Sequence, residues 1–83
     1  MQYIVTCFPV RFTKEDIPQL VSETQEINGI IQVIQDNLVA SAKHSIGLSA
    51  LDYDKPMDML IQAYLTDEQI KTFKKYRRKN HEC

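Results

Sequence analysis

The sequence predicts an α+β domain whose strands and helices follow the order β-α-β-β-α-β-α. Two observations support this order: runs of β-branched and aromatic residues mark four strands, and apolar residues at three- and four-residue spacing mark helices between them. The chain has 83 residues, whereas chains normally divide into several domains only beyond about 200 residues. We therefore expect residues 1–83 to form a single domain.

The first strand is expected over residues 2–8, which are rich in β-formers and stop at a proline. The first helix follows, and both Thr13 and Asp16 are plausible N-caps for it. We favour Asp16, because Pro18 then falls in the first turn, where its missing N–H costs nothing, and Gln19 completes a capping-box-like pair. The apolar stripe of this helix consists of Ile17, Leu20, Val21, Thr24 and Ile27.

The middle of the chain is expected to form a hairpin and a short helix. Asn28-Gly29 is typical of a helix C-cap with positive φ, so it should end the first helix. A β-branched run over 30–35, a tight turn at Asp36-Asn37 and a returning strand over 38–42 then predict the hairpin. The short helix is expected within 43–51.

The last third of the chain is expected to add a strand and a helix. Alternation over 57–64 predicts the fourth strand, and the capping box Thr66-Asp67-Glu68-Gln69 opens the last helix. The inner side of that helix carries Ile70, Phe73 and Tyr76 or Arg77. A ferredoxin-like split β-α-β unit would treat this helix as an addition. Three helices covering one face of a four-stranded antiparallel sheet explain more, because the last helix then becomes a packing element.

The composition excludes several classes of protein. With 43% hydrophobic and 25% charged residues and no apolar run longer than three, the chain has no transmembrane helix. No signal peptide is indicated either, so we expect a cytoplasmic protein. Two cysteines do not make a disulfide scaffold, and Cys7 is expected to be a small buried hydrophobe, with Cys83 at the frayed end.

The charge is distributed unevenly along the chain. Residues 1–68 hold four basic and ten acidic residues, whereas residues 69–83 hold six basic residues and one acidic residue. The simpler interpretation is that these cations complement the dipole of the last helix and form a solvated face. The alternative is an anion-binding surface, although the acidic remainder would repel polyanions, so nucleic acid is not expected as a partner. The basic block consists of Lys71, Lys74, Lys75, Arg77, Arg78 and Lys79.

The segment 42–51, with the sequence AKHSIGLSAL, resembles the stretch after the third strand in HPr, the histidine-containing phosphocarrier of the bacterial sugar phosphotransferase system. Lys43, Gly47 and Leu51 match that family in register, and the opening of the last helix and the order of elements extend the resemblance over the whole chain. The resemblance implies an open-faced sandwich with the sheet order 1-4-2-3.

The phosphocarrier residues of that family are missing from this chain. The resemblance places Thr13 at the position of the phosphorylated histidine, or Glu15 in an alternative alignment on Pro18. Both alignments lose the nucleophile and the arginine that clamps phosphate, and the acidic pair Glu15 and Asp16 would repel a phosphoryl donor. No catalytic residue is therefore expected.

The second helix carries the remaining candidate residues. His44 matches the regulatory serine of some HPr proteins, and Ser45 is one step away, so a phosphate on either could be stabilised by the helix N-terminus. A cap role for Ser45 and a solvated ring for His44 are the simpler interpretations. The residues that match the partner-docking patch of HPr include Ile46 and Ser49, and of these Ile46 keeps the apolar character. His81 is expected to be inert.

Other chemistries lack their residues. Gly29 and Gly47 cannot form a phosphate loop, and no cysteine or histidine spacing suits a metal, so neither a metal nor another cofactor is expected. The leading hypothesis is a non-catalytic, HPr-like regulatory or protein-interaction domain with an unidentified protein partner. The alternatives are a phosphotransferase component phosphorylated at His44 or Ser45, and an anion-surface binder that uses the basic C-terminal helix.

Overall fold

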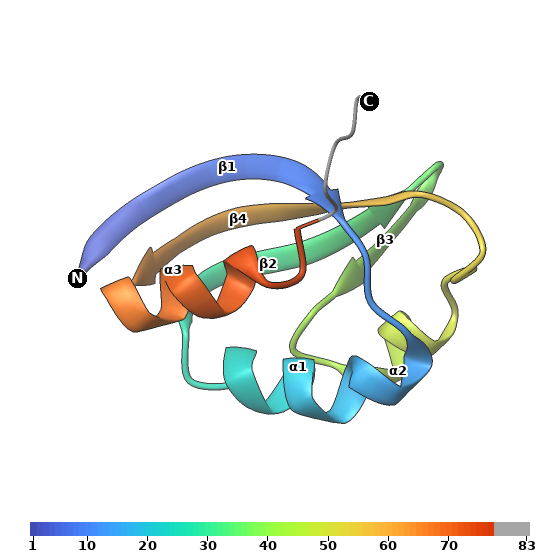
Figure 1. Cartoon of the computed structure of the whole chain (residues 1–83), viewed down its shortest axis with the longest axis horizontal. Helices are drawn as coiled ribbons and strands as arrows, with labels where there is room; N and C mark the ends of the chain where they lie inside the picture. Colours follow the sequence, from blue (N-terminus) through green and yellow to red (C-terminus); the bar gives the residue numbers. More distant parts are fainter. Residues whose placement is uncertain (78–83) are drawn as a thin grey trace.

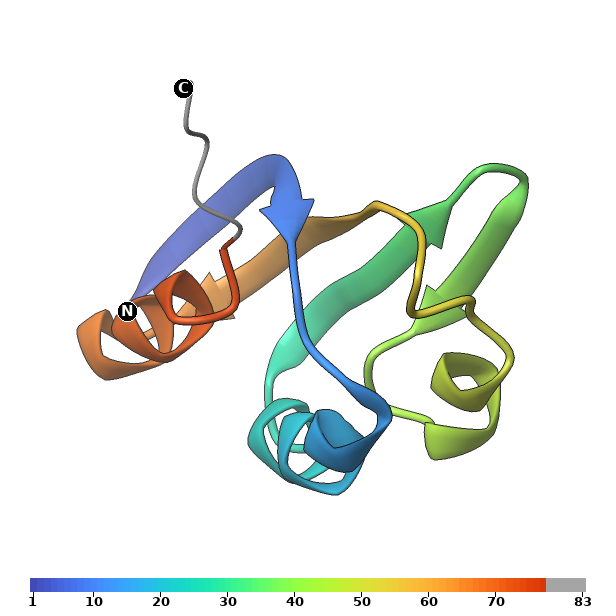
Figure 2. The same cartoon turned by 45° about the vertical axis from the view of Figure 1, so that its right-hand side comes forward.

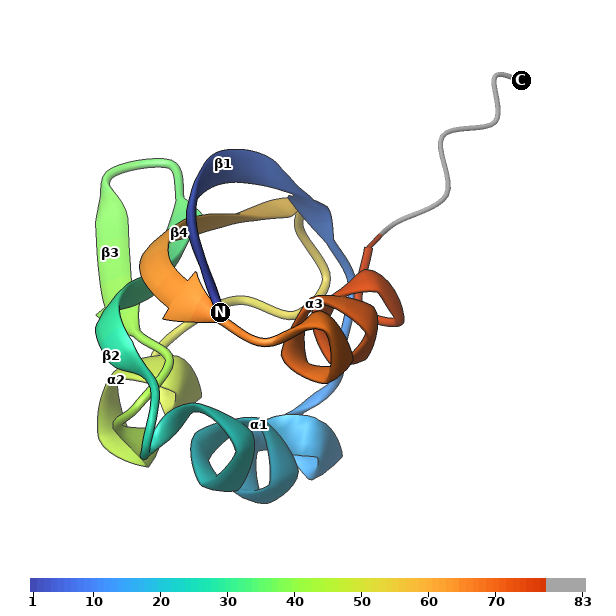
Figure 3. The same ribbon diagram turned by 90° about the vertical axis from the view of Figure 1, so that its left-hand side faces the viewer.

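The computed structural model describes residues 1–77, which form an α+β open-faced sandwich. Four antiparallel strands form one sheet in the order β1-β4-β2-β3, and the helices lie on one side of it (Figures 1 and 3). The fold class, the element order and the order of the strands are therefore confirmed. The elements are β1 (Gln2–Val10), the 3-10 turn η1 (Lys14–Asp16), α1 (Ile17–Thr24), β2 (Asn28–Gln35), β3 (Leu38–Ser41), α2 (Ser45–Ser49), β4 (Met57–Leu65) and α3 (Asp67–Lys74).

The core lies between the inner face of the sheet and the helices. Alternate residues of β4 point inward, and α3 contributes Phe73, which is buried. The last helix is thus a packing element of the core, as the sequence predicts. The fully buried large side chains are Val10, Leu20, Thr24, Ile31, Val33, Leu48, Met59, Ile61 and Leu65.

Strand β1 runs through Pro9 to Val10, so the prediction that the proline ends it is wrong. In the sheet, β1 is an edge strand, and Pro9 lies opposite Asp58 of β4. An edge strand tolerates proline because the missing N–H can face the open side. The prediction that Cys7 is buried is also wrong, because Cys7 is exposed on the side of the sheet away from the helices.

Helix α1 begins after Asp16 with Pro18 in its first turn, as the sequence predicts, and the 3-10 turn η1 precedes it. Thr13, in extended conformation, is the N-cap of η1, and the chain passes without a break from η1 into α1. Asp16 has helical dihedrals and makes no N-cap hydrogen bond. The expected pair with Gln19 does not form, because Gln19 Nε2 donates instead to Glu23 Oε2 at 3.2 Å.

Asn28-Gly29 is the start of β2, not the C-cap of the first helix, which ends at Thr24. The positive φ is present, at 139° for Gly29, but it lies within a pair of strands and not at a helix end. A Cβ on Gly29 would lie 2.5 Å from Ala63 Cα and 2.5 Å from Gln62 O of β4. Glycine at this position therefore allows β2 to pair with β4. The turn at Asp36-Asn37 is as predicted, with Asp36 at a φ of 52°.

Two side-chain contacts tie the connecting segments to this frame. Gln35 is 3% exposed, and its amide bridges the loop after α2: Nε2 donates to Asp52 O at 2.6 Å, and Oε1 accepts from Asp52 N–H at 2.8 Å. At the other end of the sandwich, Tyr76 Oη donates to Glu23 Oε1 at 2.8 Å, which links α1 to the segment after α3.

We expect Gly29→Ala to lower the free energy of unfolding by about 2–4 kcal/mol, since it combines positive-φ strain with a clash against β4. Chemical denaturation measures the change. Gly47→Ala is the matched control, because its Cβ would meet Ala40 Cβ at 3.4 Å, an ordinary contact. Alanine inside a helix should be neutral or stabilising there by up to about 1 kcal/mol. Equal losses in both variants would contradict the role given to Gly29.

Burial and the hydrogen bond to Glu23 raise the pKa of Tyr76 above its ordinary value. The unfolded chain therefore loses the phenol proton first, from about pH 10. This contribution to stability is complete below that pH and declines as the pH rises toward the folded pKa. We expect Tyr76→Phe to cost about 1 kcal/mol at pH 7 and to flatten the alkaline decline, measured by denaturation between pH 7 and 11. An unchanged decline would show that other groups cause it.

Candidate functional site

The start of the first helix is closed by its own carboxylate. Asp16 Oδ2 accepts from Thr13 N–H at 2.9 Å and from Thr13 Oγ1 at 3.2 Å. Thr13, at the position that the resemblance gives to the phosphohistidine, is exposed but has its donors engaged in these bonds. Glu15 beside it is exposed as well, so two carboxylates lie where a phosphate would need cations.

A hollow of about 350 Å³ lies next to this helix start. One wall is the connection from β1 to η1, which includes Arg11 and Thr13, and the other is the loop 53–57, which includes Asp54 and Lys55. Charges of both signs line it, so it does not form a uniform anion cradle. Gln35 holds the base of this loop through its bonds to Asp52.

The second candidate region is α2, and we call His44, Ser45, Ile46 and Ser49 together the α2 surface. All four residues are exposed. His44 occupies the N-cap position in extended conformation without a capping bond from its side chain. Ser49 Oγ donates to Ser45 O at 2.9 Å, so Ser49 satisfies its hydroxyl within the helix.

The inner side of α2 is fixed firmly to the domain. Leu48 is fully buried, and its carbonyl accepts from Tyr53 Oη at 2.7 Å. Burial raises the pKa of the Tyr53 phenol, so it remains a donor at neutral pH. Ile46 points the other way and is 88% exposed, the largest exposed fraction of any large apolar side chain in residues 1–77.

The two candidate regions adjoin each other, because α1 and α2 are neighbours below the sheet (Figure 2). The C-terminal end of α1 contacts the entry to α2: Thr24 Oγ1 donates to Ala42 O at 2.9 Å, and Gln25 Nε2 donates to Lys43 O at 2.7 Å. At the other end of that helix, Thr13 lines the same hollow as Tyr53, whose hydroxyl donates to Leu48 O of α2. Among the described residues no hydrogen bond joins Thr13 to His44 or Ser45, since the bonds of Thr13 are made to Asp16.

Lys43, one of the residues that carries the HPr resemblance, has a structural role. Its Nζ donates to Ile27 O at 2.6 Å and to Gly29 O at 3.1 Å, which ties the entry of α2 to the start of β2. Sequence reasoning matched this lysine but gave it no contact. Because its ammonium is engaged, Lys43 is not a free cation for a phosphate on α2.

Part of the basic block on the last helix is engaged in contacts. Lys75 Nζ lies 3.2 Å from Glu23 Oε2, and the Arg77 guanidinium lies 5.5 Å from the centre of the Phe8 ring. Lys71 and Lys74 are in the last turn of α3, where they complement the helix dipole as expected. Arg78, Lys79, His81 and Cys83 lie outside the described residues.

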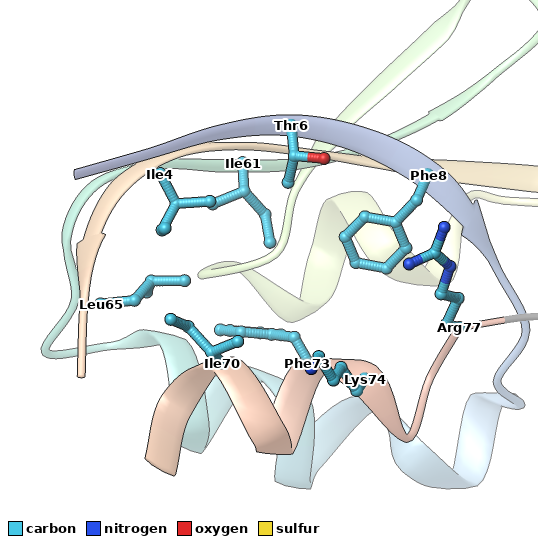
Figure 4. Close-up of a pocket in the computed structure, with 9 residues that line it drawn as sticks. All are labelled: Ile4, Thr6, Phe8, Ile61, Leu65, Ile70, Phe73, Lys74 and Arg77. Atoms are coloured by element: carbon cyan, nitrogen blue, oxygen red, sulfur yellow. The ribbon is translucent and has the colours of Figure 1, made fainter. Parts of the chain in front are cut away.

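A small apolar cavity of about 120 Å³ separates α3 from the inner face of β1 and β4 (Figure 4). Ile4, Thr6 and Phe8 of β1 form its roof, and Ile70 and Phe73 of α3 form its floor. Lys74 and Arg77 line the same cavity. Apolar side chains make up most of its lining, so we regard it as a packing gap under a short helix.

Within residues 1–77, no group of three or more histidine, cysteine or acidic side chains is arranged to hold a metal ion. No helix in that same range combines the length and apolar character that a membrane crossing requires.

Comparison of the chain with protein-family models, with curated proteins and with solved structures found no match.

We expect Asp16→Ala to lower the free energy of unfolding by about 1 kcal/mol, since it removes the acceptor that closes the first turn. Glu15→Ala is the matched control, because Glu15 is the neighbouring exposed carboxylate and makes no hydrogen bond among the described residues. Thermal or urea unfolding of both variants checks the difference. If Glu15→Ala costs as much as Asp16→Ala, the effect is that of first-turn charge and not of the Thr13 bonds.

Proposed function

We propose that this chain is an HPr-like domain that does not carry phosphate on its first helix and instead binds a partner protein through the α2 surface. It acts as a non-catalytic interaction or regulatory domain. The observation on which the proposal depends is the 88% exposure of Ile46, on a helix whose opposite side is anchored in the core.

Three features support the HPr-like part of the proposal. The sheet order 1-4-2-3 and the three helices agree with the architecture that the resemblance implies. The residues that carry the resemblance also have packing roles: Gly47 faces Ala40, Leu51 is buried, and Lys43 ties α2 to β2. Matching residues with packing roles indicate a shared fold and do not indicate a shared activity.

The start of the first helix supports the loss of phosphate transfer. A phosphohistidine needs a histidine nucleophile and donors that hold the phosphoryl oxygens. Thr13 replaces the histidine, and the Asp16 carboxylate already accepts from Thr13 N–H. A phosphoryl group arriving there would meet Asp16 and Glu15, both acidic.

The α2 surface supports protein binding. An exposed isoleucine flanked by small polar side chains supplies apolar contact area with little rotamer entropy to lose, which suits a docking contact. The anchoring of Leu48 and Tyr53 below it means that the helix need not reorder on binding.

Two other functions stay as predictions. The exposure of His44 and Ser45 at the start of α2 favours phosphorylation there. The exposed cations Lys71 and Lys74 on α3 favour anion binding, which salt-dependent retention on heparin would test.

We expect Ile46→Lys to abolish capture of the partner protein that the tagged wild-type chain retains from a cell lysate, because a charge replaces the apolar contact. Quantitative mass spectrometry of the captured proteins makes the comparison. Leu38→Lys, at an exposed apolar residue beside the β2–β3 turn, is the matched control and should capture the same partner as the wild type. A partner captured equally well by the Ile46→Lys variant and by the wild type would contradict the proposed surface.

Intact mass distinguishes the phosphotransfer alternatives in the same preparation. The chain is incubated with phosphoenolpyruvate and the first phosphotransferase enzyme and, separately, with ATP and the HPr kinase. Our proposal expects no added phosphate under conditions that label an authentic HPr. A gain of one phosphate that is lost in His44→Ala or Ser45→Ala would replace the proposal with regulation by phosphate on α2.

A further inference from the structure

The sheet has a second face, which we call the outer face, and no helix of residues 1–77 covers it (Figure 3). The strand register defines its rows, because residues paired across neighbouring strands point to the same side. Tyr3 is paired with Tyr64, and Val5 is paired with Gln62, which in turn pairs with Ile30. The outward positions are Tyr3, Val5, Cys7, Pro9, Asn28, Ile30, Gln32, Ile34, Val39, Ser41, Asp58, Leu60, Gln62 and Tyr64.

Apolar and aromatic side chains dominate the outer face. Val5 is 63% exposed, Val39 59%, Tyr3 56%, and Ile30 and Tyr64 47% each. Asp58 is the only charged residue at the outward positions of the four described strands. An antiparallel sheet with one solvated face normally alternates apolar inward and polar outward residues, so the outer face has the composition of a buried surface.

We propose that the outer face binds the outer face of a second copy of this chain, so that two open-faced sandwiches stack sheet on sheet into a symmetric dimer. This interaction is separate from the α2 surface and does not depend on the proposed function. In the dimer the two sheets face each other about 10 Å apart, and the helices of each copy lie on the outside.

The area of the outer face is that of a weak dimer. Four strands about 4.8 Å apart, paired over roughly 25 Å, give a footprint on the order of 450 Å² per copy. Two copies then bury on the order of 900 Å², which is the size of a weak, transient interface. The dimer is accordingly expected to be concentration-dependent and to dissociate on dilution.

The charge of the face favours a second copy over a different partner. A surface built for a different protein commonly shows charges that the partner complements. The outer face presents one carboxylate near one end, at Asp58, opposite Pro9. A two-fold axis in the plane of the interface and across the strands places that end against the Tyr3 and Tyr64 end of the other copy. The two carboxylates therefore do not meet, and the apolar centres coincide.

Sedimentation velocity of the full chain under reducing conditions tests the proposal over roughly 5–500 µM, the range expected for an interface of this size. We expect a monomer–dimer equilibrium for the wild type. Ile30→Lys on β2 and Tyr64→Lys on β4 should weaken it by at least about tenfold, because each buries a charge at the contact. Ile46→Lys, on the α2 surface, should dimerise as the wild type does.

The lysine variants lie on the two inner strands of the sheet, so they separate face stacking from edge pairing. A dimer that persists in both variants would be joined through the edge strands and would overturn the proposal. A wild-type chain that stays monomeric at every concentration would overturn it as well. Alkylation of Cys7 provides a second test on the wild-type chain, so its result does not depend on whether the lysine variants fold. Its rate, followed on the Cys7 peptide, should fall as the concentration of wild-type chain rises, and a constant rate would contradict a contact over β1.

Discussion

Strand β4 is the element on which the rest of this domain depends. It is hydrogen-bonded on both sides, to β1 over its whole length and to β2 over most of it. Its inward residues Met57, Met59, Ile61, Ala63 and Leu65 are all buried and form the floor against which the helices pack. Its outward residues include Leu60 and Tyr64, so the same strand also sets the character of the open side.

The pairing of β4 with β2 includes one position that leaves no room for a side chain. At Gly29 the two backbones approach so closely that a Cβ would overlap Ala63. Since side chains alternate with period two, a shift of one residue would exchange the inner and outer sets of β2. Two constraints therefore fix the same register of β2 against β4. Gly29 fixes it by excluded volume, and the buried inward residues fix it by burial.

Periodicity and turn chemistry predicted the number, type and order of the elements, because these signals are local in the chain. The order of strands in the sheet is not local, and here it came only from the resemblance of residues 42–51 to HPr. The position of β1 at the edge is a consequence of that order, and so is the acceptance of Pro9 within the strand.

The sequence also left undecided which side of β1 faces the core. Ile4 and Phe8 alternate with Val5 and Cys7, so both faces of the strand are apolar and period two cannot distinguish them. That ambiguity led to the wrong expectation for Cys7 and concealed the outer face. The helix start offers two cap residues, and the structure uses both. Thr13 is the N-cap of η1, while Asp16 stands at the N-cap position of α1 and accepts from Thr13 N–H.

The two surfaces of this domain depend on different parts of it. The α2 surface is held by Leu48, Tyr53 and Lys43 on the helical side, while the outer face depends on the sheet register alone. A partner on α2 and a second copy on the outer face would approach from opposite sides. The arrangement permits a bivalent assembly in which dimerisation doubles the number of docking helices, with the gain in avidity that multivalency gives.

The distance along the chain between β1 and β4 has a consequence for biosynthesis. β1 leaves the ribosome before β4, as a segment from Met1 to Val10 without a single charged side chain, and its only partner strand among the described residues begins at Met57. A translating ribosome adds about 5–20 residues per second, so β1 waits several seconds, unpaired, before β4 exists. During that interval the nascent chain carries an apolar strand with two free edges, which is the kind of segment that chaperones bind and that aggregates when they do not.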